Sequence, residues 1–223
     1  MIPWEDLHQT TLPSGETLSL HRRHDEFVIR AGGVELMNSR IHGSERALGE
    51  LATTPIAHHT APKVLIGGLG MGFTLASALE HLPETAQVVC AELVPAVIHW
   101  NRGPLAHLNA SALDDPRVEI VEADVQSLIT AREKEWDAII LDVDNGPEGL
   151  TRVANDELYT TSLLQSARTS LTRKGILAIW SVSRDPAFER RLKGANFDVQ
   201  ALPVYAHGTK GRRYLVWRAT RKF

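Results

Sequence analysis

Cysteine is almost absent from this sequence, which contains one, Cys90, among 223 residues. A single cysteine excludes an internal disulfide framework and is compatible with a reducing compartment. The sequence also lacks any run of roughly 18 consecutive apolar residues, the length that a membrane-spanning helix needs. Its first ten residues carry acids instead of the basic segment that opens a secretory signal. We therefore expect a cytoplasmic protein with no membrane partner.

Neither sign of charge dominates, because 24 Lys and Arg residues stand against 27 Asp and Glu residues. The basic residues are scattered except in the segment 210–223, so no basic face for nucleic acid is indicated. The adjacent His58 and His59 have no Cys, Asp or Glu at metal-ligand spacing. The composition predicts a compact enzyme with no nucleic-acid partner and no metal site.

Short apolar segments alternate with helical patterns from Pro62 to the end of the chain. The patterns predict buried strands over residues 64–66, 87–91, 118–121, 138–141 and 176–180. They predict helices over residues 74–82, 95–103, 124–134, 156–171 (with Gly175 near the C-cap) and 186–193. Two last strands, 197–204 and 214–219, follow each other without a helix and predict an antiparallel hairpin. The expected fold is α/β, a doubly wound, mostly parallel seven-stranded sheet that ends in this hairpin.

The N-terminal part has a different pattern. Residues 16–37 contain loosely alternating apolar residues with a turn at Gly32 and Gly33, which predicts a small antiparallel β unit. Ser44 is the predicted N-cap of a short helix that ends before Pro55. We therefore divide the chain into a small β-hairpin unit with a short helix, residues 1–55, and a larger domain, residues 56–223.

A glycine loop, GGLGMG, follows the strand at 64–66 and opens the next helix. Glycines at positions 68, 70 and 72 let the backbone turn tightly and approach a ligand, although a turn that only needs positive φ explains the pattern equally well. Glu92 ends the next strand twenty residues later, where a carboxylate can accept hydrogen bonds from ribose hydroxyls. The sequence thus predicts a nucleoside site. Its predicted residues in the loop and at this strand end are Gly68, Leu69, Gly70, Met71, Gly72, Glu92 and Leu93.

Two further acids end strands at the same predicted edge of the sheet. Asp124, followed by Val125, is placed to accept a hydrogen bond from the adenine amine, and it can also cap the next helix. Asp142 ends the strand at 138–141 and is followed by Asp144 and Asn145. A carboxylate there can orient or deprotonate a nucleophile or attract a cation. We predict that Asp142 and Asp144 are catalytic residues. For Asp144, a structural role in an Asx-type turn is nearly as consistent with the sequence.

The order of several segments resembles the spermidine synthase family. The matching segments are GGVELM, VLIGGLGMGFTL, VVCAEL, DPRVEIVEADV, WDAIILDVDNGPEGL, NDELY and GILAIW. The resemblance implies a small N-terminal β domain before a class I methyltransferase-like domain. It implies binding of decarboxylated S-adenosylmethionine and transfer of its aminopropyl group to a diamine. It also implies nucleoside roles for the three loop glycines, Glu92 and Asp124, and a loop role for Asp142.

The sequence departs from the family pattern at three places. Met71 stands where the family's GGGDGG loop has its acid, and Asn145 stands where its DxxDP loop has the second acid. The segment resembling the family's YHE gate reads LGE, so Leu48 and Gly49 precede Glu50. A thioether cannot replace the carboxylate that holds an aminopropyl end, whereas the carboxylate of intact S-adenosylmethionine can meet backbone amides of a glycine loop.

These departures favour an S-adenosylmethionine-dependent transferase that moves a methyl group to a small-molecule acceptor. The alternatives are a polyamine aminopropyltransferase using decarboxylated S-adenosylmethionine and a nucleoside-binding module without catalysis. A dinucleotide oxidoreductase is disfavoured because the third glycine of GxGxxG is missing. A homodimer is considered as the assembly. The candidate acceptor contacts are Ser39, His42, Asn145 and Tyr159. A turn or helix cap is the simpler interpretation for Ser39 and His42, an Asx-type turn is nearly as consistent for Asn145, and packing is the simpler interpretation for Tyr159.

Overall fold

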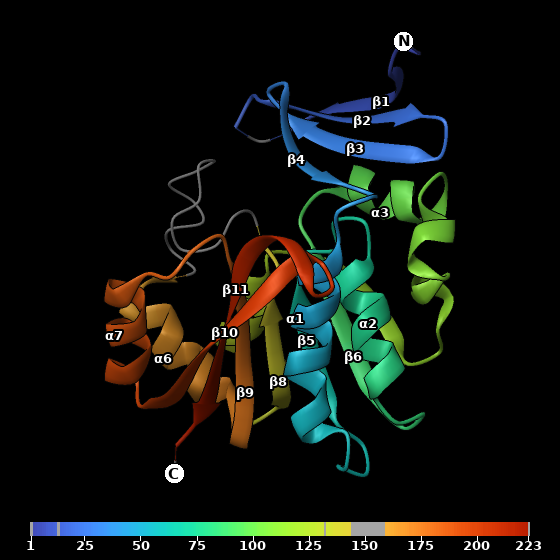
Figure 1. Ribbon diagram of the computed structural model, residues 1–223. Coiled ribbons are helices and arrows are strands. Elements are labelled where there is room, and N and C mark those ends of the chain that lie inside the picture. Colours follow the sequence, from blue (N-terminus) through green and yellow to red (C-terminus); the bar gives the residue numbers. More distant parts are fainter. Residues whose placement is uncertain (1, 13, 132, 144–158, 223) are drawn as a thin grey trace.

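The computed structural model describes residues 2–12, 14–131, 133–143 and 159–222, and it contains two β-sheets (Figure 1). Within these ranges, no helix combines the length and the apolar content that crossing a bilayer requires. The first elements are β1 Glu5–Thr11, β2 Thr17–Arg23, β3 Glu26–Ala31, β4 Val34–Asn38, α1 Gly43–Thr53 and the 3₁₀ turn η1 Thr54–Ile56. The central ones are β5 Lys63–Gly67, α2 Phe73–His81, β6 Gln87–Glu92, α3 Pro95–Arg102, η2 Ala106–Asn109, η3 Ala112–Asp114 and β7 Val118–Glu122. The last are α4 Val125–Ala131, β8 Trp136–Leu141, α6 Thr161–Ser170, β9 Leu171–Ser181, α7 Pro186–Gly194, β10 Phe197–His207 and β11 Lys210–Arg221.

The larger sheet has seven strands in the order β10-β11-β9-β8-β5-β6-β7. Strands β5 to β9 are parallel to one another, whereas β11 is antiparallel to both β9 and β10. The predicted α/β fold, with its seven-stranded sheet and closing hairpin, is confirmed. The strand order changes direction between β5 and β8, which is the position where open parallel sheets bind their ligands.

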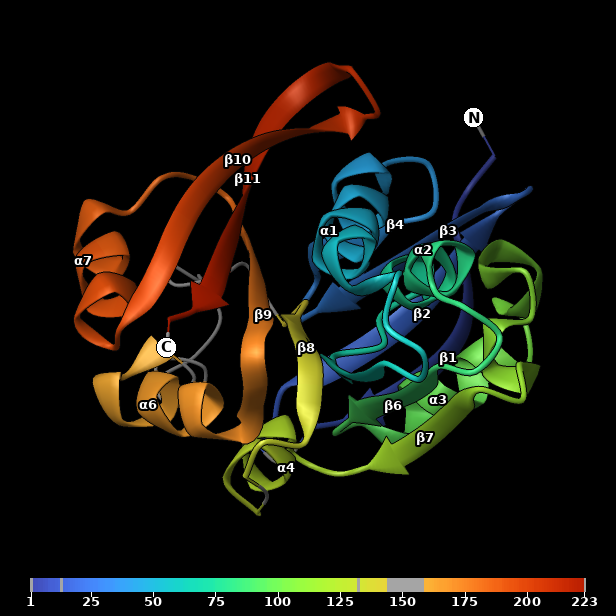
Figure 2. The ribbon, with the colours of Figure 1, turned by 90° about the horizontal axis from the view of Figure 1, so that it is seen from below.

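Alternate residues of the central strands supply two separate cores. Val64 and Ile66 of β5 belong to one core, whereas Leu65 between them belongs to the other. The same alternation occurs in β8 and β9, because successive side chains of a strand point to opposite faces. Figure 2 shows α1 and α2 on one side of the sheet and α4 and α6 on the other. Burial on both faces explains why these strands are nearly continuous apolar segments.

The N-terminal sheet is antiparallel, in the order β1-β2-β3-β4, and lies over the end of the larger sheet that carries the glycine loop (Figure 1). Leu20 and Ile29 from this sheet share a core with α1 and α2. Met37 of β4 lies directly against Gly70, since a Cβ added there would be 3.0 Å from the Met37 sulfur. The small sheet therefore forms part of the surroundings of the loop.

Helix α1 packs against α2. A Cβ at Gly49 would lie 2.6 Å from the carbonyl oxygen of Thr74, so the two helices are in backbone contact there. The predicted N-cap at Ser44 is wrong: the helix follows His42, and the Ser44 hydroxyl donates to the Glu45 carboxylate at 2.6 Å. The two-domain division at residue 55 stays a prediction.

Helix α6 is shorter at its C-terminus than the sequence predicts. It ends at Ser170, and β9 begins at the next residue, so Gly175 lies within a strand and not at a helix C-cap. Residues 156–158, where the predicted helix begins, lie outside the described residues. Leu171, the first residue of β9, is buried in the second core.

Candidate functional site

The glycine loop connects β5 to α2 and is built so that two of its positions require glycine. Gly68 has φ +91° and Gly72 has φ +81°, both in the left-handed region that side chains disfavour. A Cβ at Gly68 would collide with the Asp142 carbonyl, and one at Gly72 would lie 2.7 Å from the Asn109 Cβ. The Gly68 N–H donates to the Ala91 carbonyl at 2.9 Å. The loop is thus fixed between the ends of β6 and β8.

Glu92 is buried at the end of β6 and holds the loop in place. Its Oε2 accepts a hydrogen bond from the Leu69 N–H and its Oε1 accepts one from the Val94 N–H, both at 2.9 Å. A carboxylate at the end of this strand is the group that accepts hydrogen bonds from ribose hydroxyls in nucleoside-binding parallel sheets. Leu93, beside it, is 59% exposed and offers an apolar surface next to the carboxylate. The predicted ribose contact stays a prediction.

Asp124 caps α4, the role that the sequence left open beside adenine binding. Its Oδ1 accepts a hydrogen bond from the Gln126 N–H at 2.9 Å, and its side chain is exposed. Val125 is buried directly against β5, because a Cβ at Gly67 would lie 2.8 Å from its methyl carbon. The cap fixes the carboxylate at the edge of the sheet, where the adenine contact stays a prediction.

Asp142 at the end of β8 faces two residues that the sequence did not single out. The Thr74 hydroxyl donates to Asp142 Oδ2 and lies 3.1 Å from the carbonyl oxygen of Glu45. Thr74 is in the first turn of α2, and Glu45 is in the first turn of α1. The site therefore has a side formed by α1 that no motif predicted, since only packing of the two helices brings these residues together.

His42 precedes α1, and its ring packs against the ring of Phe73. The two rings meet edge to face with centroids 4.2 Å apart. Burial lowers the pKa of the His42 imidazole, and the positive charges of Arg46 and His207 lower it further. Both effects favour the uncharged form of this imidazole.

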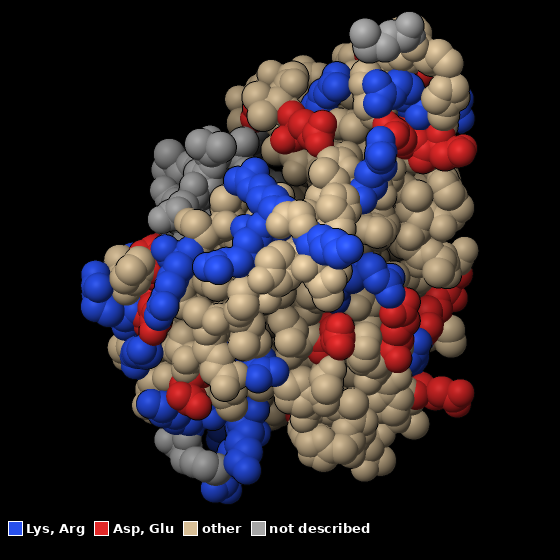
Figure 3. Space-filling model, in the orientation of Figure 1, with Lys and Arg blue, Asp and Glu red and all other residues tan. Residues whose placement is uncertain are grey.

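The β10–β11 hairpin borders the same region. A Cβ at Gly43 would lie 2.6 Å from the Gly208 N and 2.7 Å from the Tyr205 carbonyl oxygen, so the end of the hairpin touches the start of α1. Figure 3 shows Lys and Arg side chains gathered over this hairpin. The exposed basic residues of its turn are Lys210, Arg212 and Arg213.

Two buried asparagines support the glycine loop, and the sequence did not predict this role. Asn101 Nδ2 donates to the Gly70 carbonyl at 2.8 Å, and Asn109 Nδ2 donates to Asn101 Oδ1 at 2.8 Å. Both asparagines are almost fully buried. Their spacing of eight residues crosses from α3 into η2, so the pair has no helical or strand periodicity by which it could have been recognised.

Several predicted residues lie outside this arrangement. Ser39 is bound to β3, since its hydroxyl accepts a hydrogen bond from the Phe27 N–H at 2.9 Å. The Tyr159 ring packs edge to face on Phe188, and its hydroxyl lies 3.4 Å from the Val143 carbonyl. The Met71 side chain is completely buried in the first core, so only its backbone is available to a ligand.

The segment that resembles the family's gate lies on α1. Leu48 is completely buried and Gly49 lies in the α1–α2 contact, while Glu50 is exposed. Helix packing therefore keeps the Leu48 side chain out of the site. Asp144 and Asn145 lie outside the described residues.

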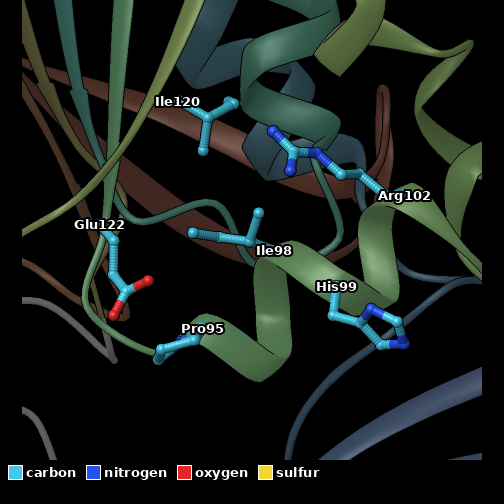
Figure 4. Close-up of a pocket in the computed structure, with 6 residues that line it drawn as sticks. All are labelled: Pro95, Ile98, His99, Arg102, Ile120 and Glu122. Atoms are coloured by element: carbon cyan, nitrogen blue, oxygen red, sulfur yellow. The ribbon is translucent and has the colours of Figure 1, made fainter.

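A separate surface pocket of about 310 Å³ lies between α3 and β7 (Figure 4). Glu122 and Pro95 lie at one end of it and Arg102 at the other, with Ile98 and Ile120 between them. None of its lining residues belongs to the glycine loop or to the predicted nucleoside contacts. Pro95 and Glu122 nevertheless lie close in sequence to the predicted contacts Leu93 and Asp124.

Comparison with known proteins connects this geometry to one family. A polyamine aminopropyltransferase of Sodalis glossinidius is 32% identical over 54% of this chain and 40% of its own length. A polyamine aminopropyltransferase of Serratia proteamaculans is 27% identical over 69% of this chain and 55% of its own length. The chain thus spans about half the length of these relatives. A spermidine synthase crystallised with the transition-state analogue AdoDATO shares the fold, with TM-score 0.75 and 19% identity over 97% of this chain and 72% of its own.

These findings correct the preferred reaction. Methyl transfer was favoured from Met71, but the curated relatives are aminopropyltransferases and the related structure is a spermidine synthase. The methyl-transfer prediction is wrong, because it treated Met71 as a side chain of the site, whereas this side chain lies in the core. The model of the spermine/spermidine synthase domain matches residues 47–192. The chain belongs to the spermine/spermidine synthase domain family.

Proposed function

We propose that this protein is a polyamine aminopropyltransferase, which uses decarboxylated S-adenosylmethionine and an amine acceptor. The observation that carries the proposal is the family match over residues 47–192, which includes every carboxylate-bearing strand end of the site. In the reaction, an acceptor nitrogen attacks the propyl carbon next to the sulfonium. The carbon–sulfur bond breaks, and its electron pair stays on sulfur to give 5′-methylthioadenosine.

The nucleoside half of the donor fits the end of β5 and β6. The glycine loop follows β5, and Glu92, which accepts hydrogen bonds from the Leu69 and Val94 N–H groups, ends β6 at the position where nucleoside-binding parallel sheets hold the ribose. We assign the adenine to the region of Leu93, Asp124 and Val125, where an exposed apolar side chain adjoins a fixed carboxylate. Of the loop residues Leu69 and Met71, only the backbone is assigned a contact.

The reacting half belongs at Asp142. Its carboxylate is partly exposed at the end of β8 and is oriented by the Thr74 hydroxyl. A negative charge there attracts the cationic sulfonium and the ammonium groups of both substrates. The decarboxylated donor suits this position because it carries an amine and no carboxylate that Asp142 would repel.

An assay with decarboxylated S-adenosylmethionine and separate amines, putrescine, cadaverine and spermidine, tests the proposal. Mass spectrometry should find 5′-methylthioadenosine and one aminopropylated amine in equal amounts. If calorimetry shows binding of the nucleoside but none of the amines is converted, the proposal is refuted, and the chain is a nucleoside-binding module.

A further inference from the structure

Glu45 is an acidic residue that α1 places next to Thr74, the residue that binds Asp142. It lies in the first turn of the helix, where its backbone carbonyl is 3.1 Å from the Thr74 hydroxyl that also donates to Asp142. Its side chain is partly exposed, unlike Leu48 and Gly49 on the buried face of the same helix. The Ser44 hydroxyl donates to Glu45 Oε2 at 2.6 Å, which fixes the orientation of the carboxylate.

The surroundings of Glu45 favour proton transfer. Burial raises the pKa of its carboxyl, although the hydrogen bond from Ser44 acts in the opposite direction. A carboxylate whose pKa approaches the working pH is a better general base than one with an ordinary value. The inference rests on the position of Glu45 next to Thr74 and Asp142, and the raised pKa agrees with it.

The charged and titratable groups near the start of α1 come from three elements. His42, whose pKa is lowered by burial, and Arg46 belong to the start of α1, Asp142 follows β8, and His207 belongs to the hairpin that touches α1. Arg46 is paired with Glu80 of α2 at 2.7 Å and is partly exposed. Within the described part of the chain, no Lys or Arg forms an ion pair with Glu45, so its charge is available to a cationic ligand.

The glycine loop supplies no second carboxylate, because its Met71 side chain is buried in the core. We infer that Glu45 is a catalytic residue of the acceptor site, which binds the ammonium end of the amine and accepts a proton from the attacking nitrogen. This inference rests on the proposed aminopropyl transfer. The nitrogen forms its bond to the propyl carbon, the carbon–sulfur electrons go to sulfur, and the N–H proton goes to the Glu45 carboxylate. Asp142 remains charged and stabilises the cationic substrates.

The inference is tested with Glu45→Gln and with Glu50→Gln as a matched control on the same helix. Glutamine keeps the size of the side chain and an oxygen that accepts from Ser44, and a melting curve checks that both variants fold. Glu45→Gln should lower kcat about 10²- to 10⁴-fold, the usual contribution of a general base. Its affinity for 5′-methylthioadenosine should change less than about twofold, and Glu50→Gln should match the wild type.

The pH profile separates proton transfer from a purely structural role. Glu45 must be deprotonated to accept the proton, so kcat of the wild type should rise with pH through the raised pKa of this group. That limb should be absent in Glu45→Gln and present, with a shifted midpoint, in Glu45→Asp. The inference would be overturned if Glu45→Gln kept the wild-type kcat. It would also be overturned if weaker nucleoside binding accounted for the whole loss of activity in this variant.

Calorimetry with putrescine, on protein saturated with 5′-methylthioadenosine, distinguishes this inference from the proposed function. Putrescine affinity should fall at least about tenfold in Glu45→Gln and not in Glu50→Gln, whether or not turnover occurs. Turnover by the wild type with an unaffected Glu45→Gln variant overturns only the role of Glu45. Weaker putrescine binding in Glu45→Gln without any wild-type turnover overturns the reaction but keeps the binding role.

Discussion

Replacing Glu92 by glutamine should both destabilise the protein and weaken nucleoside binding. The carboxylate is only 8% exposed, and each of its oxygens accepts one backbone N–H at 2.9 Å, from Leu69 and from Val94. A glutamine has one oxygen, so one backbone N–H would face an amide NH₂ group. A hydrogen bond to a charged group contributes about 1.5–3 kcal/mol, and we expect a loss of about 2–3 kcal/mol in the free energy of unfolding. For a chain of this length, that lowers Tm by roughly 4–12 °C.

The matched control is Glu122→Gln, because Glu122 lies opposite Glu92 in the register of β6 and β7 and is exposed. It should change stability by less than about 0.5 kcal/mol. Denaturant unfolding measures stability, and calorimetry with 5′-methylthioadenosine should show about 10- to 100-fold weaker binding for Glu92→Gln alone, since each tenfold is about 1.4 kcal/mol. If the two variants cannot be told apart in either measurement, the role assigned to Glu92 is refuted.

Three further predictions concern the loop and the core. Gly68→Ala should lower stability by at least about 1–2 kcal/mol in denaturant unfolding, because φ is +91° and the Asp142 carbonyl lies in the way; unchanged stability would refute this strain. Asn101→Leu should weaken binding of 5′-methylthioadenosine about tenfold, since the Gly70 carbonyl loses a buried donor; equal affinity by calorimetry would contradict it. Burial, then Glu92 and Asp142, raise the pKa of the Cys90 thiol, so Ellman's reagent should label Cys90 only after unfolding, and rapid labelling of folded protein would contradict its burial.

The fold was predictable because the central strands are buried on both faces and therefore stand out as apolar segments. The antiparallel hairpin was also predictable, since two strand patterns follow each other without a helix. Strand β1 was missed because its sequence, EDLHQTT, is mostly polar and its side chains are mainly exposed. Pairing with β2 gives this segment its structure, and such pairing leaves no pattern in the segment itself.

The positions of Glu92, at the end of β6, and of Asp142, directly after β8, were predictable from the apolar strands that precede them, whereas their roles stay predictions. Glu45 was missed because its burial arises from the packing of α1 on α2, and its neighbours in sequence form no motif. The burial of Leu48, in the segment that resembles the family's gate, arises from the same helix packing and could not be predicted from the motif. Met71 misled the choice of reaction because a loop position in sequence does not reveal which side of the loop the side chain takes.

The most direct test of the central claim is a competition in one reaction. The protein is incubated with putrescine and equal amounts of decarboxylated and intact S-adenosylmethionine, and the nucleoside products are measured by mass spectrometry. Aminopropyl transfer predicts accumulation of 5′-methylthioadenosine together with spermidine, and no S-adenosylhomocysteine. Accumulation of S-adenosylhomocysteine with methylated amine, or no product from either donor, would contradict the account.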